Sequence, residues 1–260
     1  MEIRLDGRTA LITGGSKGLG LAMAVEFARS GADVAILARD PKTLEAAQTT
    51  ISATAKGRVV AYPCDVSKAE EIQAAWAKVT AALGKIDILV NNAGGSIRGK
   101  IEDVTDQMWQ EDLDVKLFGA IRFIRLAFPA MKERKWGRII NVLSTAAKAQ
   151  VGGGSPTEVT RAAGMALTKV VAGEGAPHGV LVNALLVGSI VSDQAVRGHR
   201  VRAPEMKFED YVKMRGEKIP LGRMGRAEEF ANIACFLASD AGSYITGTAL
   251  NVDGGASPVV

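Results

Sequence analysis

Cysteine and histidine are scarce in this chain, which contains two of each among 260 residues. That is too few for a disulfide framework or for a zinc centre built from these residue types. Cys64 and Cys235 each stand beside apolar neighbours, which favours buried, reduced thiols and a reducing compartment. We therefore expect no metal site and a cytoplasmic protein.

Long hydrophobic runs and strongly biased charge are also absent. No run approaches the ~18 apolar residues of a membrane span, and the N-terminus has no apolar signal region. The net charge of +4 comes without a basic tail, which argues against a nucleic-acid partner. A chain of 260 residues that is 47% hydrophobic is long enough for one well-buried domain, with no membrane or nucleic acid among its expected partners.

Short apolar runs rich in β-branched residues alternate with longer segments of helical spacing. The runs predict strands at 9–13, 33–37, 58–62, 86–90, 137–143, 180–186 and 249–252. Helices are predicted between them, including 69–83 and a long helix with one break at 105–134. Because parallel strands need crossover connections, this alternation predicts a doubly wound α/β fold with a mostly parallel seven-stranded sheet and helices on both faces. Residues 188–225 are dense in Gly, Pro and charge, and we expect an irregular lid there.

The first predicted strand runs directly into Thr-Gly-Gly-Ser-Lys-Gly-Leu-Gly at 13–20. Glycines there allow a tight turn and close approach of the backbone to a pyrophosphate, while the following helix N-terminus supplies unpaired N–H groups. Taken alone, the loop fits a plain strand-turn-helix junction equally well. Its place after the first strand of an alternating α/β pattern favours a dinucleotide site. The expected contacts in this loop are Gly14, Ser16, Lys17, Gly18, Leu19 and Gly20.

The end of the second predicted strand bears on the choice of dinucleotide. An acidic residue there would bind the adenosine ribose hydroxyls and repel a 2′-phosphate, but the chain has Ala38 and Arg39. NADP(H) is therefore favoured over NAD(H), with Lys17 as a second cation near the same phosphate. The alternative is that Arg39 and Lys17 are solvated surface charges.

The spacing Thr-Gly-x-x-x-Gly-x-Gly resembles the short-chain dehydrogenase/reductase family, and the resemblance covers nearly the whole chain. The further matching segments are Asp65-Val66, Asn91-Asn92-Ala93-Gly94, Ser144, Thr246-Gly247 and Asn251-Val252-Asp253-Gly254-Gly255. The resemblance implies a single Rossmann-type domain over residues 1–260, with the lid at about 188–225. It also implies that the cofactor meets Asp65, Val66, Asn92, Ala93, Gly94, Arg161, Gly188 and Ile190.

The catalytic positions depart from that family. Its members use an Asn, a Ser, a Tyr and a Lys, in which Tyr exchanges a proton with the substrate oxygen, while Lys lowers the Tyr pKa and holds the nicotinamide ribose. Position-by-position matching retains only Ser144 and puts Lys116, Thr157 and Arg161 in place of the Asn, Tyr and Lys. A Thr hydroxyl is a far weaker acid than a phenol of pKa ~10. Arg161 stays protonated and cannot relay protons as Lys can.

Three side chains could replace the missing acid, and each has a structural interpretation too. The pKa of Lys116 could fall beside Arg161, although Lys116 could equally be an ion-pair partner. His199 and Tyr211 could act if the lid folds over the site, or they could be a solvated loop residue and an apolar anchor of the lid. The arginines at 196–202 fit an acidic substrate, but nearby carboxylates would neutralise much of their field.

Three functions follow from these features. The first is an NADP(H)-dependent oxidoreductase that acts on a carbonyl or alcohol of a small molecule, with Ser144, Lys116, Thr157 and Arg161 as its candidate catalytic residues. The second is a non-redox lyase or isomerase on the same fold, and the third is an inactive nucleotide-binding homologue. If the rest of the site is intact, changing Thr157 to Tyr and Arg161 to Lys should create or raise reductase activity.

The expected oligomer rests on the same resemblance. Family members commonly form homodimers and homotetramers through the helices that correspond to 105–134 and 155–173. The second of these has a face of small and apolar residues, namely Ala162, Ala163, Ala166 and Val170, which suits close helix packing. The same face could instead belong to the core of the single chain.

Overall fold

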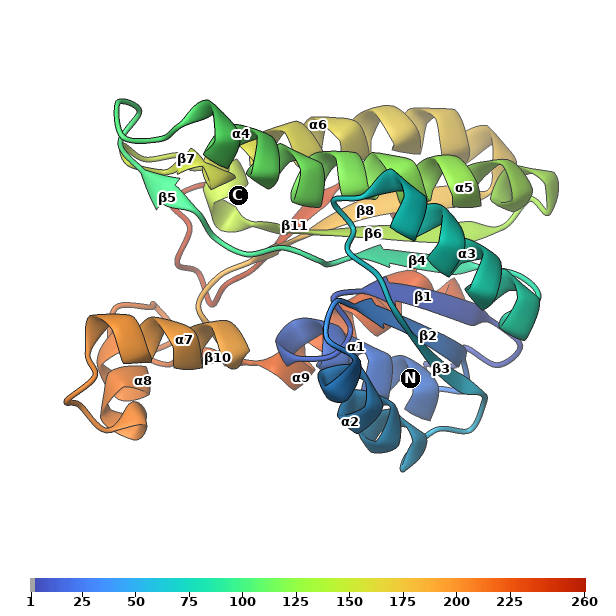
Figure 1. The fold of residues 1–260 in the computed structure, drawn as a ribbon, viewed down its shortest axis with the longest axis horizontal. Helices are drawn as coiled ribbons and strands as arrows, with labels where there is room; N and C mark the ends of the chain where they lie inside the picture. Colours follow the sequence, from blue (N-terminus) through green and yellow to red (C-terminus); the bar gives the residue numbers. More distant parts are fainter. Residues whose placement is uncertain (1–2) are drawn as a thin grey trace.

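A sheet of seven parallel strands forms the centre of the computed structural model, which describes residues 3–260 (Figure 1). The strand order is β11-β8-β6-β4-β1-β2-β3. The bounds are β1 (Thr9–Thr13), β2 (Asp33–Ala38), β3 (Val59–Pro63), β4 (Ile88–Asn91), β6 (Gly137–Ser144), β8 (Val180–Val187) and β11 (Ala249–Val252). All seven predicted strands are present, with ends that differ by one or two residues at most. The predicted doubly wound fold is confirmed.

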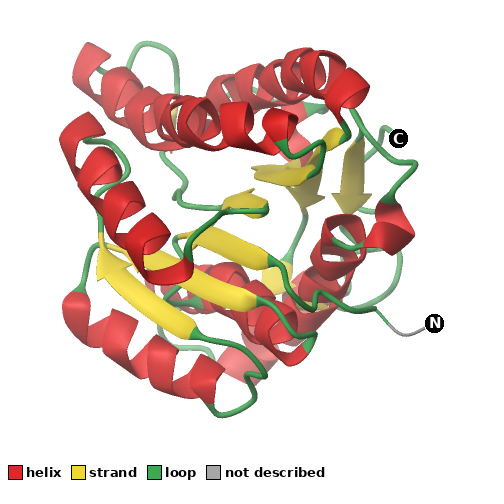
Figure 2. Cartoon of the chain, turned by 90° about the vertical axis from the view of Figure 1, so that its right-hand side faces the viewer, coloured by secondary structure: helices red, strands yellow, loops and turns green. Residues whose placement is uncertain are grey.

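Helices cover both faces of the sheet, as Figure 2 shows. One face carries α1 (Gly18–Arg29), α2 (Pro41–Ser52) and α9 (Ala227–Ala238), and the other carries α3 (Ala69–Leu83), α5 (Gly119–Glu133) and α6 (Thr157–Gly175). Successive side chains of a strand point to opposite faces. Ala10 and Ile12 of β1 accordingly enter one apolar core, and Leu11 between them enters the other. Two covered faces explain why the strands are continuous apolar runs.

The break in the long predicted helix is a π-helical turn. Residues 105–134 form α4 (Asp106–Leu113), the π-helical segment η1 (Asp114–Phe118) and α5. Such wider turns occur mostly as single insertions in α-helices, often at functional sites. Gly119 follows η1 because a Cβ atom there would lie 3.0 Å from the Val66 carbonyl oxygen. The π-turn places Lys116 on the buried side of the helix.

The expectation that residues 188–225 are irregular was wrong, because they contain two helices, which we call the lid helices; that they act as a lid stays a prediction. These are α7 (Asp193–Arg202) and α8 (Phe208–Gly216), preceded by β9 (Ile190–Val191), which pairs with β10 (Gly225–Arg226). Figure 1 shows α7 and α8 standing off from the body of the fold. Tyr211 is 2% exposed, which confirms its interpretation as an anchor. His199 is no solvated loop residue, since its ring lies in α7 against the rings of Phe208 and Tyr211.

The remaining short elements close the loops. They are the antiparallel pair β5 (Arg98–Gly99) and β7 (Ser155–Pro156), and the 3-10 turns η2 (Thr145–Ala147), η3 (Ala176–His178) and η4 (Asp240–Gly242). Within residues 3–260, none of the helices combines the length and the apolar character needed to cross a membrane.

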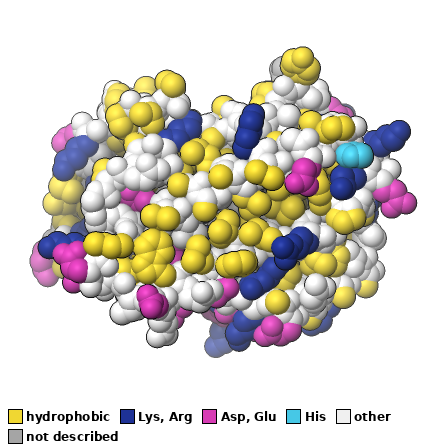
Figure 3. Space-filling model, turned by 90° about the horizontal axis from the view of Figure 1, so that it is seen from above, with side chains coloured by type: hydrophobic (Ala, Val, Ile, Leu, Met, Phe, Trp, Pro, Cys, Tyr) yellow, Lys and Arg dark blue, Asp and Glu magenta, His cyan; other side chains and the backbone are white. Residues whose placement is uncertain are grey.

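The small-residue face of α6 is not part of the core of the chain. Ala166 is exposed and Val170 is 60% exposed, so the interpretation of this face as core was wrong. Figure 3 looks down on the side of the molecule formed by α4, α5 and α6, and apolar side chains gather in the middle of that side. The homodimer or homotetramer stays a prediction.

Candidate active site

The glycine loop is built so that only glycine fits at its key positions. Gly14 and Gly18 have φ of 64° and 55°, in the left-handed region that side chains disfavour. A Cβ atom on Gly20 would lie 2.2 Å from the Gly14 carbonyl oxygen. Lys17 is the N-cap residue of α1, and its side chain accepts no hydrogen bond from the N–H groups of the first turn. The loop therefore fits a pyrophosphate held by backbone N–H groups at the N-terminus of α1.

Asn92 joins the glycine loop to the end of β4. Its Nδ2 donates to the carbonyl oxygens of Thr13 and Gly14, over 2.9 and 3.1 Å. The backbone N–H groups of Asn92 and Ala93 both donate to Thr13 Oγ1. A Cβ atom on Gly94 would lie 2.9 Å from Arg161 Nη2. The Asn-Asn-Ala-Gly segment thus links the predicted cofactor loop to α6.

The cations expected near an adenosine phosphate are exposed. Arg39 directly follows β2 and Lys17 lies in the glycine loop, and both are open to solvent. Burial alone would raise the pKa of the Asp65 carboxyl, but hydrogen bonds from Ser67 and the charge of Arg39 hold it below its ordinary value. Arg39 and Asp65 therefore lie near one another, where the sequence predicts the adenosine half of the cofactor.

Several other predicted cofactor residues also have packing roles. The Val66 side chain lines an internal cavity next to η1. Ile190 is 7% exposed and belongs to an apolar core. A Cβ atom on Gly188 would lie 2.4 Å from the Asp253 Cβ, so glycine is needed there for the C-terminal segment to approach β8. Cofactor contact by these residues stays a prediction.

Thr157 begins α6 with its hydroxyl fully engaged. The side chain is buried, and Oγ1 accepts from Lys116 Nζ over 2.7 Å and from the Ile97 backbone N–H over 2.9 Å. Its own proton goes to Asp112 Oδ1 at 3.2 Å. A hydroxyl has one donor and two acceptor positions. Thr157 therefore has no free proton for a substrate unless this network opens.

Lys116 lies beside Thr157 in a buried ion pair. Its Nζ also donates to Asp112 Oδ1, and the two side chains are 3% and 0% exposed. Burial lowers the pKa of the Lys116 ammonium to about 8, helped by the charge of Arg161 and opposed by the hydrogen bond to Asp112. The interpretation of Lys116 as an ion-pair partner is confirmed, and its role as a substitute acid stays a prediction.

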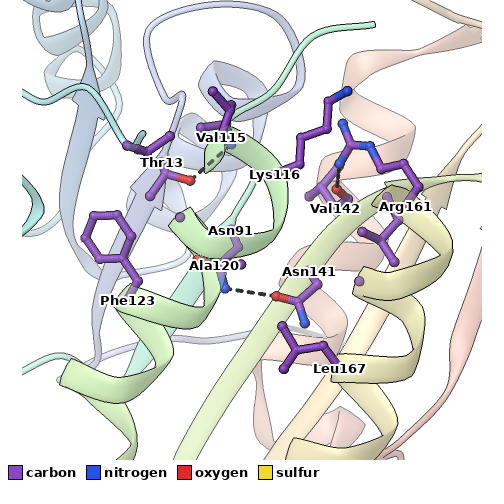
Figure 4. Close-up of a pocket in the computed structure, with 15 residues that line it drawn as sticks. Thr13, Asn91, Val115, Lys116, Ala120, Phe123, Asn141, Val142, Arg161 and Leu167 are labelled. Atoms are coloured by element: carbon purple, nitrogen blue, oxygen red, sulfur yellow. Dashed lines mark hydrogen bonds between the residues drawn. The ribbon is translucent and has the colours of Figure 1, made fainter. Parts of the chain in front are cut away.

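Arg161 extends from the next turn of α6 toward β6. Its Nη1 donates to the Val142 carbonyl oxygen, and Figure 4 shows its guanidinium on the same side as the end of Lys116. Burial lowers its pKa to about 10, so it is a cation at neutral pH. Arg161 and Lys116 line one internal cavity. Two cations therefore occupy the region where the family has Asn, Tyr and Lys.

Ser144 lies at the carboxyl end of β6, next to the start of α6. Its Oγ accepts from the Ala146 backbone N–H over 3.3 Å, so the hydroxyl proton is free to be donated elsewhere. The turn that follows, η2, packs against α6. The structure thus brings Ser144 to the same end of the sheet as Thr157 and Arg161.

In this arrangement the polar side chains of the lid helices contact one another and the nearby backbone. His199 Nε2 is hydrogen-bonded to the Met206 carbonyl oxygen. The Tyr211 hydroxyl accepts from Arg215 Nη1, and Arg215 Nη2 reaches Ser189 Oγ. Arg197 pairs with Asp193 within α7. Residues proposed from the sequence as substitute acids or anion contacts therefore serve largely to hold the lid together.

Sequence reasoning missed Asp112 and a chain of buried amides. Asn91 Nδ2 donates to Asn141 Oδ1 over 2.9 Å (Figure 4). Asn141 Nδ2 in turn donates to Thr168 Oγ1, also over 2.9 Å. This chain ties β4 and β6 to α6 beneath the two cations. Asp112 precedes Lys116 by four residues, the spacing of neighbours on a helix. That spacing was the signal that could have found it.

Comparisons with known proteins agree with this architecture. The family model described as enoyl-(acyl carrier protein) reductase matches residues 14–257. D-beta-hydroxybutyrate dehydrogenase of Rhizobium meliloti is 34% identical over 254 residues, which cover 95% of this chain and 98% of that protein. A 3-oxoacyl-[acyl-carrier-protein] reductase of Aquifex aeolicus is 34% identical over 255 residues, covering 98% and 99%.

Solved structures give the same picture. L-sorbose reductase of Gluconobacter frateurii, complexed with NADPH and L-sorbose, is 30% identical and superposes with a TM-score of 0.94 over 100% of both chains. A short-chain type dehydrogenase/reductase of Mycobacterium marinum is 32% identical, with a TM-score of 0.87 over 99% of this chain and 98% of that one. The fold is therefore shared from end to end.

Proposed function

Because the chain belongs to the short-chain dehydrogenase/reductase family, we propose that it is an NADP(H)-dependent oxidoreductase in which the Lys116 ammonium replaces the missing tyrosine acid. The observation that carries this proposal is the position of Lys116 Nζ, 2.7 Å from Thr157 Oγ1. Thr157 stands where the tyrosine side chain of the family would begin. An acidic group therefore lies next to the position from which the tyrosine would extend.

The cofactor half of the proposal rests on the glycine loop and on charge. Gly14, Gly18 and Gly20 keep the loop backbone open to a pyrophosphate, and Arg39 and Lys17 are available to a 2′-phosphate. The bound dinucleotide would supply the hydride. The NADPH present in the sorbose reductase structure supports the same preference here, with Arg161 holding the nicotinamide ribose.

The proton half of the proposal assigns distinct tasks to three side chains. The Ser144 hydroxyl, whose proton is free, would donate a hydrogen bond to the substrate carbonyl oxygen. Lys116, with a pKa of about 8, is mostly protonated at neutral pH yet gives up its proton readily, as a general acid should. Arg161 remains charged and stabilises negative charge that develops on the oxygen. Carbonyl, hydride and proton together give the alcohol.

The substrate is proposed to be a small molecule with a ketone or secondary alcohol. The relatives bear names that refer to 3-hydroxy and 3-oxo acyl compounds and to a ketose, so a test panel should contain 3-oxoacyl thioesters, acetoacetate and ketohexoses. An acidic substrate remains part of the proposal, because the positive charges of Arg161 and Arg98 act on this region together with that of Lys116, against the carboxylate of Asp112.

The test is oxidation of NADPH by the wild-type chain against that panel, followed by absorbance at the nicotinamide band. Lys116→Met should lower kcat by about 100-fold or more, the contribution expected of a general acid. Lys100→Met, which removes an exposed lysine near the site, should leave kcat unchanged. Equal rates for Lys116→Met and wild type would remove Lys116 from the mechanism.

A second candidate function is binding of the nucleotide without turnover. The engaged hydroxyl of Thr157 and the burial of the Lys116–Asp112 pair favour it, because both must rearrange before a proton moves. Tight NADPH binding without oxidation on any panel member would support this function. Conversion of a panel compound without cofactor turnover would instead indicate the lyase or isomerase alternative.

Assembly as a homodimer or homotetramer is part of the proposal. The exposed apolar side chains of α6, Val159 and Val170 among them, lie on a face that a second copy could cover. Light scattering of wild type and Val170→Asp measures this directly, since the charged variant should shift the protein toward the monomer.

A further inference from the structure

Asp112 is the only buried residue of α4. An amphipathic helix normally turns its apolar residues toward the core and its charged residues toward water. In α4 the apolar residues Met108, Trp109 and Leu113 are only partly buried, whereas Asp112 is 2% exposed. A buried carboxylate is costly unless charged or hydrogen-bonded partners compensate. The buried carboxylate of Asp112 therefore needs a specific partner that compensates its charge.

The contacts of Asp112 converge on the proposed acid. Oδ1 accepts both from Lys116 Nζ and from Thr157 Oγ1. Oδ2 is buried and has no hydrogen-bond partner among the described residues. Full satisfaction of both oxygens would be expected of an aspartate kept for stability alone. The one engaged oxygen instead serves the two residues that stand in for the family's Asn and Tyr.

We infer that Asp112 is a positioning residue that holds Lys116 in its charged form and aims its ammonium at the head of α6, so that Asp112, Lys116 and Thr157 work as one unit. The effect on Lys116 is independent of the reaction. Its consequence for catalysis rests on the proposed function.

The charges around Lys116 give the direction of the effect. Arg161 on α6 and Arg98 on β5 both disfavour its protonated form, and Asp112 on α4 favours it. Asp112→Asn keeps the size of the side chain and an oxygen acceptor but removes the negative charge. Lys116 would then face the cations Arg161 and Arg98 without the opposing charge of Asp112, and its pKa should fall below about 8.

The first test needs no substrate and no cofactor. A lysine with a depressed pKa in the folded state makes the free energy of unfolding rise with pH between its folded and unfolded pKa values, because the unfolded chain binds the extra proton there. For wild type this window runs from about 8 to the ordinary value of 10.5. Urea unfolding from pH 5.5 to 10 is measured for wild type, Lys116→Met, Asp112→Asn and the double variant.

The free energy of unfolding of each protein, minus that of the same protein with Lys116→Met, gives the contribution of Lys116 to stability at each pH. In the wild-type background this difference should begin to rise near pH 8, and in the Asp112→Asn background at least one pH unit lower. Asp112→Glu restores the charge and should return the onset toward 8. Glu111→Gln, which removes an exposed acid from the same helix, should leave it unchanged. The same onset in the Asp112→Asn and wild-type backgrounds would overturn the inference.

If Asp112→Asn does not fold, Asp112→Ser takes its place in the same comparison, because serine is smaller, carries no charge and keeps an oxygen acceptor. Its onset should lie at least one pH unit below that of wild type, while Glu111→Gln matches wild type. The same onset in Asp112→Ser and in wild type would overturn the inference in that case.

The second test separates this inference from the proposed function. With NADPH and an active panel compound, Asp112→Asn should move the alkaline limb of kcat to lower pH by the same amount as the unfolding onset, with little change in the KM for NADPH. A shifted unfolding onset with an unshifted rate profile supports the role of Asp112 and refutes Lys116 as the proton donor. If neither moves, Asp112 does not set the charge of Lys116.

Discussion

Replacing Thr157 by tyrosine, with or without Arg161→Lys, is expected to destabilise the protein and to give little reductase activity. The sequence predicts a gain of reductase activity from Thr157→Tyr with Arg161→Lys only if the rest of the site is intact, and buried Lys116 breaks that condition. Lys116 Nζ lies 2.7 Å from Thr157 Oγ1, so it occupies space next to the point from which the new ring would extend. Thr157 itself is 4% exposed. The aromatic ring therefore has to displace a buried lysine from its carboxylate.

The cost follows from packing and charge. Overpacking a filled site costs about 1–3 kcal/mol, and separation of Lys116 from Asp112 adds to that cost because both are buried. Lys116→Asn should relieve the overpacking part of this cost, because asparagine is shorter. The triple variant Lys116→Asn, Thr157→Tyr, Arg161→Lys should thus be more stable than the variant that lacks the Lys116 change.

Urea unfolding and NADPH oxidation on the carbonyl panel measure both consequences. The triple variant should regain stability by about 1–3 kcal/mol and exceed the double variant in kcat/KM by tenfold or more. The reasoning about Lys116 would be refuted if the Thr157→Tyr, Arg161→Lys variant were as stable as wild type and as active as the triple variant.

Two further predictions concern the cofactor loop and its surroundings. Arg39→Ala should weaken NADPH binding by about 10- to 100-fold, because one charge-assisted contact to phosphate is lost, and should leave NADH binding unchanged. Calorimetry measures both affinities, with Lys78→Ala at an exposed position of α3 as the control. Equal losses for both nucleotides would contradict a 2′-phosphate site. Gly20→Ala should lower the free energy of unfolding by about 1–3 kcal/mol or prevent folding, since its Cβ atom would meet the Gly14 carbonyl oxygen at 2.2 Å. Gly173→Ala, in open space on α6, should instead stabilise by about 0.5–1 kcal/mol, and a loss of equal size at both positions would show that the close approach at Gly20 is not the cause.

The sheet could be predicted because its chemistry is local. Parallel strands covered on both faces must be continuous apolar runs, and the run at 9–13 matches the fully buried β1 residue for residue. The glycine loop could be found for a similar reason, because Gly14, Gly18 and Gly20 are fixed by backbone conformation and contact rather than by distant partners.

The lid helices escaped prediction because they lack an apolar stripe. No residue of α7 is buried, and in α8 only Tyr211 and Gly216 are. Periodicity needs several buried positions in register before it indicates a helix. The charged surfaces of these two helices therefore resemble a loop when only the sequence is considered.

The contact between Asp112 and Thr157 depends on tertiary packing that the sequence does not reveal. Glu111 and Asp114 also flank Lys116, but of these carboxylates only Asp112 stands four residues away, the spacing of neighbours on a helix. That spacing indicates the pair of Asp112 with Lys116. It does not indicate that Thr157, which is 45 residues from Asp112 along the chain, completes the group.

The most direct test of the proposed mechanism is the pH dependence of a single turnover of NADPH on the best panel substrate. If Lys116 is the acid, the rate should be constant below pH 7 and fall as pH rises through about 8, and Lys116→Met should be slow and flat over the same range. A wild-type rate that does not change between pH 6 and 9.5, or that falls equally in Lys116→Met, would contradict the assignment.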